Sequence, residues 1–73
     1  MDEFLQANWE PLQDFMKHRW TKLTDADLKE IDASYDKLVA IIQLYYGFTL
    51  ERAQQEVQEM ADDFAREPAM QPR

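Results

Sequence analysis

Cysteine is absent from this 73-residue chain, and histidine occurs once, as His18. The lack of cysteine excludes disulfide bonds, thiol nucleophiles and cysteine-ligated zinc. A catalytic histidine needs a nucleophile and an orienting partner, and the sequence shows neither. We therefore expect a protein that is not an enzyme and has no catalytic residues, no metal site and no cofactor. We interpret His18 as a cation in the last turn of a helix.

Glycine and proline are scarce, with one glycine and three prolines, whereas Ala, Leu, Glu, Gln, Lys and Met are common. The common residues are those that helix interiors prefer. No segment alternates apolar and polar residues for long enough to predict a strand. The composition therefore predicts a small all-α domain without strands.

Long apolar runs and positive charge are also missing. The longest apolar run, Leu38 to Ile42, is far too short to span a membrane, and the N-terminus lacks the features of a signal peptide. Eight Lys and Arg stand against 15 Asp and Glu, for a formal net charge of −7. This charge repels phosphate backbones and anionic lipids. We expect a soluble cytoplasmic protein that binds neither nucleic acid nor membranes.

The first helical signal lies in the N-terminal third of the chain. Asp2 can cap a short first turn, and Pro11 is tolerated only near the start of a helix. We therefore predict a helix from Asn8, a good N-cap, to about Trp20. We interpret its aromatic residues Trp9 and Trp20 as core residues rather than as ligand-stacking groups.

The clearest helical signal covers Trp20 to Gly47. Thr24 is a good N-cap, and Gly47, the only glycine, is placed to end a helix in the left-handed conformation. Between them, apolar residues recur at intervals of three and four, at Leu28, Ile31, Tyr35, Leu38, Ile42 and Tyr45. By itself, this spacing predicts one buried face on a single straight helix from Asp25 to Tyr46.

Two apolar residues do not fit that buried face. Leu44 lies on the opposite face of the expected helix, and Ile41 lies at the margin. The last turns are therefore apolar nearly all round, which indicates burial on several sides or a contact surface. Ile41, Leu44 and Phe48 are our candidate surface for a protein partner. We otherwise expect a monomer.

The last helix is expected to start at Thr49, an N-cap. Its apolar stripe consists of Leu50, Ala53, Val57, Met60, Ala61 and Phe64. Arg66 follows Asp62 by four residues, so the two side chains can pair. The Glu67-Pro68 step ends the helix, because a residue before proline avoids the α region. We therefore predict a single domain over residues 1–67 and a frayed tail over 68–73.

Two acidic clusters could be mistaken for metal sites. A calcium loop that began at Asp25 would need glycine at its sixth position and Glu at its twelfth, where the chain has Glu30 and Asp36. The acids of the last helix lack the Glu-x-x-His spacing of carboxylate metal sites. We interpret both clusters as solvated surface.

One block of sequence resembles a known family. The run W-T-K-L-T-D-A-D-L from Trp20 to Leu28, with Asn8-Trp9 before it and Tyr46-Gly47 after it, resembles the CsbD-like bacterial general stress-response family. The likeness covers roughly residues 8 to 60. The resemblance implies a small compact bundle of four to five helices, arranged as two roughly orthogonal helix hairpins, with a bend at Ala33-Ser34. Ser34 can cap the helix that follows the bend.

The family often has glycine where this chain has Asp14, Thr21, Ala33 and Ala40. Because alanine favours a helix over glycine by about 0.5–1 kcal/mol, we expect a stiffer middle segment here. The resemblance implies a non-enzymatic general stress-response protein of unestablished molecular activity, and it carries over no catalytic or ligand residues. We expect an acidic soluble protectant. The alternative is an interaction module that binds a partner through Ile41, Leu44 and Phe48.

Overall fold

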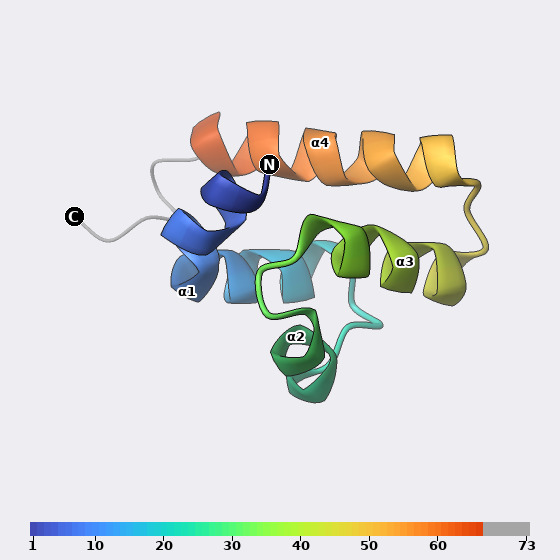
Figure 1. Cartoon of the computed structure of the whole chain (residues 1–73), viewed down its shortest axis with the longest axis horizontal. Helices are drawn as coiled ribbons and strands as arrows, with labels where there is room; N and C mark the ends of the chain where they lie inside the picture. Colours follow the sequence, from blue (N-terminus) through green and yellow to red (C-terminus); the bar gives the residue numbers. More distant parts are fainter. Residues whose placement is uncertain (67–73) are drawn as a thin grey trace.

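The computed structural model describes residues 1–66, which form four helices and no strand. The helices are α1 (Asp2–Arg19), α2 (Asp25–Ile31), α3 (Tyr35–Tyr46) and α4 (Leu50–Arg66), as Figure 1 shows. The predicted all-α bundle is confirmed with four helices, while its division into two orthogonal hairpins stays a prediction. The predicted domain end at Glu67 and the tail over 68–73 lie outside the described residues.

Helix α1 is longer than predicted. It begins at Asp2, so the predicted start at Asn8 is wrong, and Pro11 lies inside the helix. Asn8 does not cap a helix, because its side-chain Nδ2 donates to the carbonyl of Phe4 at 2.9 Å. Figure 1 shows the first turns of α1 at an angle to the rest, as expected for a helix that contains proline.

Burial explains why α1 tolerates this proline. A proline inside a helix costs about 3 kcal/mol or more, because it removes a hydrogen bond and clashes with the preceding turn. Leu5 lies before Pro11 and Leu12 and Met16 lie after it, and all three apolar side chains are fully buried. Each such burial contributes about 1.5–3 kcal/mol. The packing on both sides of Pro11 therefore outweighs the local cost.

Helix α2 is short and depends on its cap. The Thr24 hydroxyl accepts from the N–H of Asp27 at 3.1 Å, and the Asp27 carboxylate accepts from the N–H of Thr24 at 3.0 Å. This reciprocal pair is a capping box, and the predicted N-cap at Thr24 is confirmed. A seven-residue helix is too short to be stable alone. Its buried Leu28 and Ile31 must therefore supply stability by packing.

Between α2 and α3 the chain turns sharply. Asp32 and Ala33 have positive φ angles of 48° and 63°, and Ser34 then caps α3 by accepting from the N–H of Lys37 at 3.4 Å. The bend at Ala33-Ser34 is thus confirmed, and the single straight helix that the apolar spacing predicted is wrong. A left-handed residue other than glycine costs roughly 1–2 kcal/mol. Ala33 offsets this cost in part by being buried.

The φ angle of Ala33 also corrects the expectation of a stiffer middle segment at this position. Ala33 does not lie in a helix, so its higher helix propensity relative to glycine has no effect there. Its backbone adopts a conformation that glycine reaches without a Cβ penalty. Alanine at this position therefore strains the link between α2 and α3.

The end of α3 and the start of α4 follow the sequence signals. Gly47 ends α3 in the left-handed conformation, with a φ of 67°. The Thr49 hydroxyl accepts from the N–H of Arg52 at 3.1 Å, at the start of α4. Both predicted boundaries are confirmed. The short connection makes α3 and α4 antiparallel neighbours (Figure 1).

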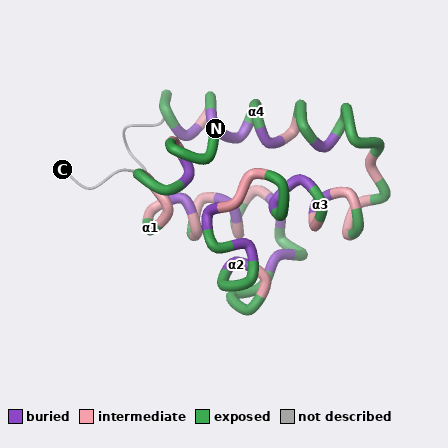
Figure 2. The backbone as a smooth tube through the Cα atoms, viewed as in Figure 1, coloured by how far each residue is buried: buried purple, intermediate pink, exposed green. Residues whose placement is uncertain are grey.

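The core lies between the four helices, with α4 packed against α1 and α3, and α2 packed against α3. Figure 2 shows buried residues on the sides of the helices that face one another. Phe64 of α4 makes edge-to-face contacts with Phe4 and Phe15 of α1, at centroid distances of 6.2 and 5.4 Å. Trp20 is buried as predicted, whereas Trp9 is only half-buried against the core. No polar or charged residue of the described chain is buried.

Candidate functional site

The predicted partner surface lies where α3 ends and α4 begins. Leu44, in the last turns of α3, is 77% exposed, whereas Ile41 and Phe48 are half-buried and pack against the core. Leu50, the first residue of α4, is 53% exposed. The sequence predicts Leu50 on the apolar stripe of the last helix, and the structure buries the other five members of that stripe but not Leu50. The first residue of α4 lies outside the contact with the core, which the apolar spacing does not indicate.

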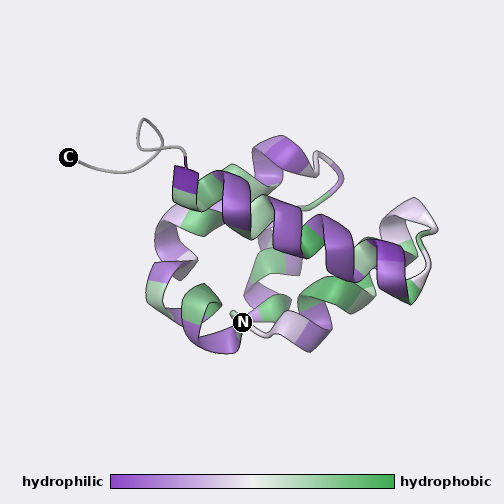
Figure 3. Ribbon diagram, turned by 90° about the horizontal axis from the view of Figure 1, so that it is seen from above, coloured by the Kyte–Doolittle hydropathy of each residue, from purple (hydrophilic) through white to green (hydrophobic). Residues whose placement is uncertain are grey.

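The stretch of sequence that contains most of α3 and the start of α4 is also uncharged. No charged residue occurs from Leu38 to Leu50, although 32% of the whole chain is charged. Exposed positions in this uncharged segment include Ala40, Gly47 and Thr49. In Figure 3, α3 is the more hydrophobic ribbon, whereas the outer face of α4 is largely hydrophilic. Leu44 and Leu50 are the large apolar residues that this segment leaves exposed, and we call these two residues the α3–α4 patch.

Two cations border the α3–α4 patch through a stack of side chains. The Lys22 ammonium lies 5.1 Å from the centre of the Tyr46 ring, and the Arg52 guanidinium lies 4.6 Å from the centre of the Phe48 ring. The two rings stack on each other at 5.6 Å. Exposed cation–π contacts contribute about 0.5–1 kcal/mol each. Phe48 is therefore a member of a structural stack, and Leu44 is the predicted partner residue that solvent reaches.

Lys22 also holds the end of α3. Its ammonium donates to the carbonyl of Tyr45 at 3.1 Å, and its backbone N–H donates to the hydroxyl of Tyr46 at 3.3 Å. A cation at this position suits the negative end of the helix. The stack and these bonds tie the α1–α2 connection to the end of α3.

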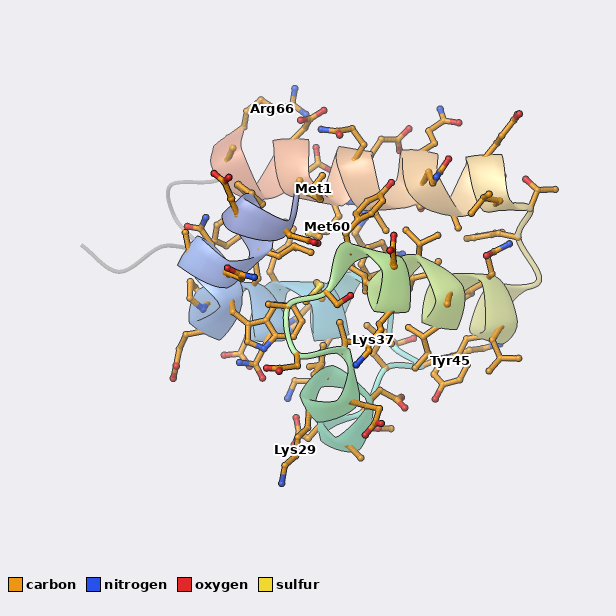
Figure 4. The ribbon with its side chains drawn as sticks, viewed as in Figure 1. Met1, Lys29, Lys37, Tyr45, Met60 and Arg66 are labelled. Carbon is orange, nitrogen blue, oxygen red and sulfur yellow. The ribbon has the colours of Figure 1, made fainter. Side chains whose placement is uncertain are left out.

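A second polar group joins α2 to α3. The Tyr45 hydroxyl donates to Asp27 Oδ1 at 2.7 Å, and Figure 4 shows Tyr45 extending from α3 toward the side of α2. This bond, together with the backbone bond from Thr24, holds the pKa of Asp27 below its ordinary value. The same carboxylate raises the pKa of Tyr45. The pair joins α2 to α3 and so helps to fix the position of α2.

A third group joins α1 to α4. Arg19 Nη1 lies 2.7 Å from Asp63 Oδ2, and the other oxygen of Asp63 lies 2.7 Å from Arg66 Nη2. The hydrogen bonds from Arg66 and Arg19 lower the pKa of Asp63. The predicted pairing of Arg66 with Asp62 is wrong, because Asp63 is one residue closer to Arg66. Asp62 accepts instead from the side-chain amide of Gln58 at 3.1 Å.

The remaining candidate residues have structural positions. His18 is exposed in the last turn of α1, where its Nδ1 is hydrogen-bonded to the carbonyl of Asp14 at 2.8 Å. Within residues 1–66, no three His, Asp or Glu side chains converge in a way that could hold a metal ion. None of the helices in this part of the chain is both long enough and apolar enough to cross a membrane.

Comparison with known proteins identifies relatives in several bacteria. The chain is 38% identical over 60 residues to a UPF0337 protein of Pseudomonas aeruginosa. The aligned region covers 82% of this chain and 92% of the relative. It is 42% identical over 56 residues to a UPF0337 protein of Pectobacterium atrosepticum, covering 77% of this chain and 81% of the relative. It is also 40% identical over 51 residues to the UPF0337 protein YjbJ of Escherichia coli, covering 70% and 74%.

No protein-family model matches the chain, and no solved structure matches it significantly. The relatives nevertheless match most of their own length and most of this chain. They support the family that the block from Trp20 to Leu28 suggested. The chain belongs to the UPF0337, or CsbD-like, family.

Proposed function

We propose that this protein is a non-enzymatic bacterial general stress-response protein that acts in the cytoplasm as an acidic protectant of other proteins. The observation that carries the proposal is the separation of apolar and charged groups. In the part of the chain that the structure describes, all buried residues are apolar. The net charge of −7 is therefore displayed on the surface of a small protein.

The outer face of α4 illustrates how this surface is built. Ion pairs and hydrogen bonds run along the helix, from Arg52 to Glu56 at 3.1 Å and from Gln55 to Glu59 at 3.3 Å. Side chains that pair along one helix stay in water and stabilise it by a few tenths of a kcal/mol each. Repulsion between copies with high net charge keeps such a protein dissolved at high concentration. The same repulsion would keep client proteins that it touches from coalescing.

A heat-aggregation experiment tests the protectant function. A thermolabile client enzyme is heated with a molar excess of this protein, and light scattering and recovered activity are measured. The matched variant carries Glu10→Gln, Glu30→Gln and Glu51→Gln. These three acids are exposed and form no ion pair in the described chain, so the variant changes charge and spares the fold.

Wild type is expected to lower scattering several-fold, and the triple variant is expected to lose most of that effect. Leu44→Asp serves as the control, because it adds negative charge and should protect at least as well as wild type. Equal protection by the triple variant, or no protection at a large molar excess, would refute the proposal.

The α3–α4 patch supports a second candidate function, a module that binds a protein partner. The exposure of Leu44, on an uncharged part of the surface bordered by Lys22 and Arg52, favours this candidate. A partner of complementary chemistry would offer an apolar side chain flanked by carboxylates. Residues near the centre of an interface contribute most to binding, so a charge placed at Leu44 should weaken such a contact.

Affinity capture from stressed cells distinguishes this module from a general protectant. Leu44→Asp is expected to lose a partner that wild type captures, because it places a charge at the centre of the patch. Ala26→Asp is the matched control, since it adds the same charge at an exposed position on α2. Capture that is equal for the two variants, or absent for wild type, would exclude the module.

A further inference from the structure

The apolar residues of α2 and α3 have a helical spacing that continues across a break in the helix. Leu28 and Ile31 belong to α2, and Tyr35, Leu38, Ile42 and Tyr45 belong to α3. Their intervals of three and four residues do not change at the connection. In the structure, α2 nevertheless runs across α3 rather than along its axis (Figure 1). The sequence of this segment is therefore compatible with a second arrangement, one continuous helix.

The connection between α2 and α3 is strained in the bent arrangement. Asp32 and Ala33 both have positive φ angles, and neither is glycine. In a continuous helix, both residues would return to the right-handed conformation that L-residues prefer. The positive φ angles thus disfavour the bent arrangement, so contacts elsewhere in the molecule must stabilise it.

Two side chains support the bend at the start of α3. The Ser34 hydroxyl accepts from the N–H of Lys37, and the Asp2 carboxylate accepts from the N–H of Tyr35 at 2.8 Å. In a continuous helix, each of these N–H groups would instead donate to a carbonyl four residues earlier. The continuous helix therefore needs neither side chain.

We propose that α2 and α3 can fuse into one helix over residues 25–46, and that two copies of the chain then exchange halves. In this swapped dimer, α1 and α2 of one copy pack on α3 and α4 of the other. This inference goes beyond the proposed function, because it concerns the assembly state of the chain.

The contacts between the two halves identify the partner as a second copy. Helices α1 and α4 meet through Phe15 and Phe64 and through Arg19 and Asp63. Helices α2 and α3 meet through Asp27 and Tyr45. A swapped dimer rebuilds all these contacts between copies, as exchange of identical elements does. Opening into any other state would leave the buried residues of both halves in water.

Two substitutions in the connection are expected to change the dimer association constant in opposite directions. Ser34→Ala removes the cap of α3 and improves helix propensity, so the dimer association constant should rise about tenfold or more. Ala33→Gly relieves the strained φ angle and weakens the continuous helix, so the constant should fall about tenfold or more. Each protein is refolded from denaturant at high concentration, and its mass is then measured by sedimentation. Circular dichroism confirms that each variant is folded.

Two controls separate the swap from other causes of association. Thr24→Ala removes a cap that both arrangements share, so it should leave the dimer fraction of folded protein unchanged. At high salt, which screens its added charge, Leu44→Asp should also leave the dimer fraction unchanged, because the α3–α4 patch takes no part in the exchange. Since each copy carries a charge of −7, added salt should raise the dimer fraction in every case.

The Ser34→Ala protein decides the outcome. A dimer that Ser34→Ala promotes, that a second change Ala33→Gly suppresses, and that exchanges labelled copies only slowly would establish the swap. A Ser34→Ala protein that stays monomeric at every concentration would overturn the proposal. So would a dimer that responds to Leu44→Asp and not to changes at the connection.

Discussion

Asp27 takes part in three hydrogen bonds, of which two cap α2 and one joins α2 to α3. Its N–H and its carboxylate complete the capping box with Thr24, and the carboxylate also accepts from Tyr45. One carboxylate therefore starts α2 and attaches it to α3. The two bonds that its carboxylate accepts are strongest while Asp27 is ionised.

The sign of the pH dependence follows from the lowered pKa of Asp27. A carboxyl group whose folded pKa lies below its unfolded value stabilises the fold above the unfolded value. The ordinary pKa is 3.8. The contribution of Asp27 should therefore be complete above about pH 5 and be lost progressively as the pH falls from there through the lower folded pKa.

Tyr45→Phe tests this assignment. Because the bond from Tyr45 is the largest cause of the shift, the variant should raise the pKa of Asp27 toward its ordinary value. The bonds from Thr24 remain, so part of the shift should persist. NMR titration of the Asp27 side chain measures the change. Tyr35→Phe is the control, and an Asp27 pKa that moves equally in both variants would contradict the assignment.

At the scale of the element, the same residue type has opposite effects at two positions. Ala40 lies within α3, whereas Ala33 lies at a positive φ between α2 and α3. Glycine at Ala40 should cost about 1 kcal/mol of stability, because it lowers helix propensity. Glycine at Ala33 should stabilise the monomer by up to about 1 kcal/mol, because it relieves the left-handed conformation. Urea denaturation measures the change in the free energy of unfolding for both variants. Changes of the same sign would contradict this explanation.

The helix boundaries that the sequence predicted correctly depend on nearby residues. Thr24, Gly47 and Thr49 act within a few positions of themselves, so their roles follow from local chemistry. The predicted start of α1 at Asn8 was wrong, because packing of Leu5 and Leu12 outweighs the local signal of Pro11. The bend at Ala33 was predicted from the family resemblance, because the apolar spacing by itself indicates a straight helix.

The candidate surface was predicted less completely than the fold. The sequence identified Leu44 because it lies on the face opposite the expected buried face of the helix, and the structure leaves it exposed. Phe48 is part of the same predicted surface, but it stacks on Tyr46, which in turn contacts Lys22. Lys22 is distant in the sequence, so only the tertiary fold brings it to this stack. Leu50 was missed because the spacing gives its angular position on α4 and not the point at which α4 meets the core.

At the scale of the molecule, stability depends on a small number of core side chains. A chain of this size is expected to have a free energy of unfolding of about 4–11 kcal/mol. Met60 of α4 is fully buried, so Met60→Ala should cost about 2–5 kcal/mol. That is a large part of the total, and the variant should be marginally folded at room temperature.

Leu44→Ala is the matched comparison for Met60→Ala. Both remove a large apolar side chain, but Leu44 is mostly exposed, so its truncation should change stability by no more than about 0.5 kcal/mol. Thermal unfolding followed by circular dichroism measures both. A similar loss from the two variants would show that Leu44 is covered in solution.

The burial of Trp20 gives the molecule an optical reporter of its own. Trp20 is 4% exposed and lies where α1 ends, close to the connection with α2. An indole that is shielded from water fluoresces at shorter wavelength than one that water reaches. In a Trp9→Phe protein, Trp20 would be the only source of tryptophan emission. The colour of that emission would follow the opening of the core in real time, without an attached dye.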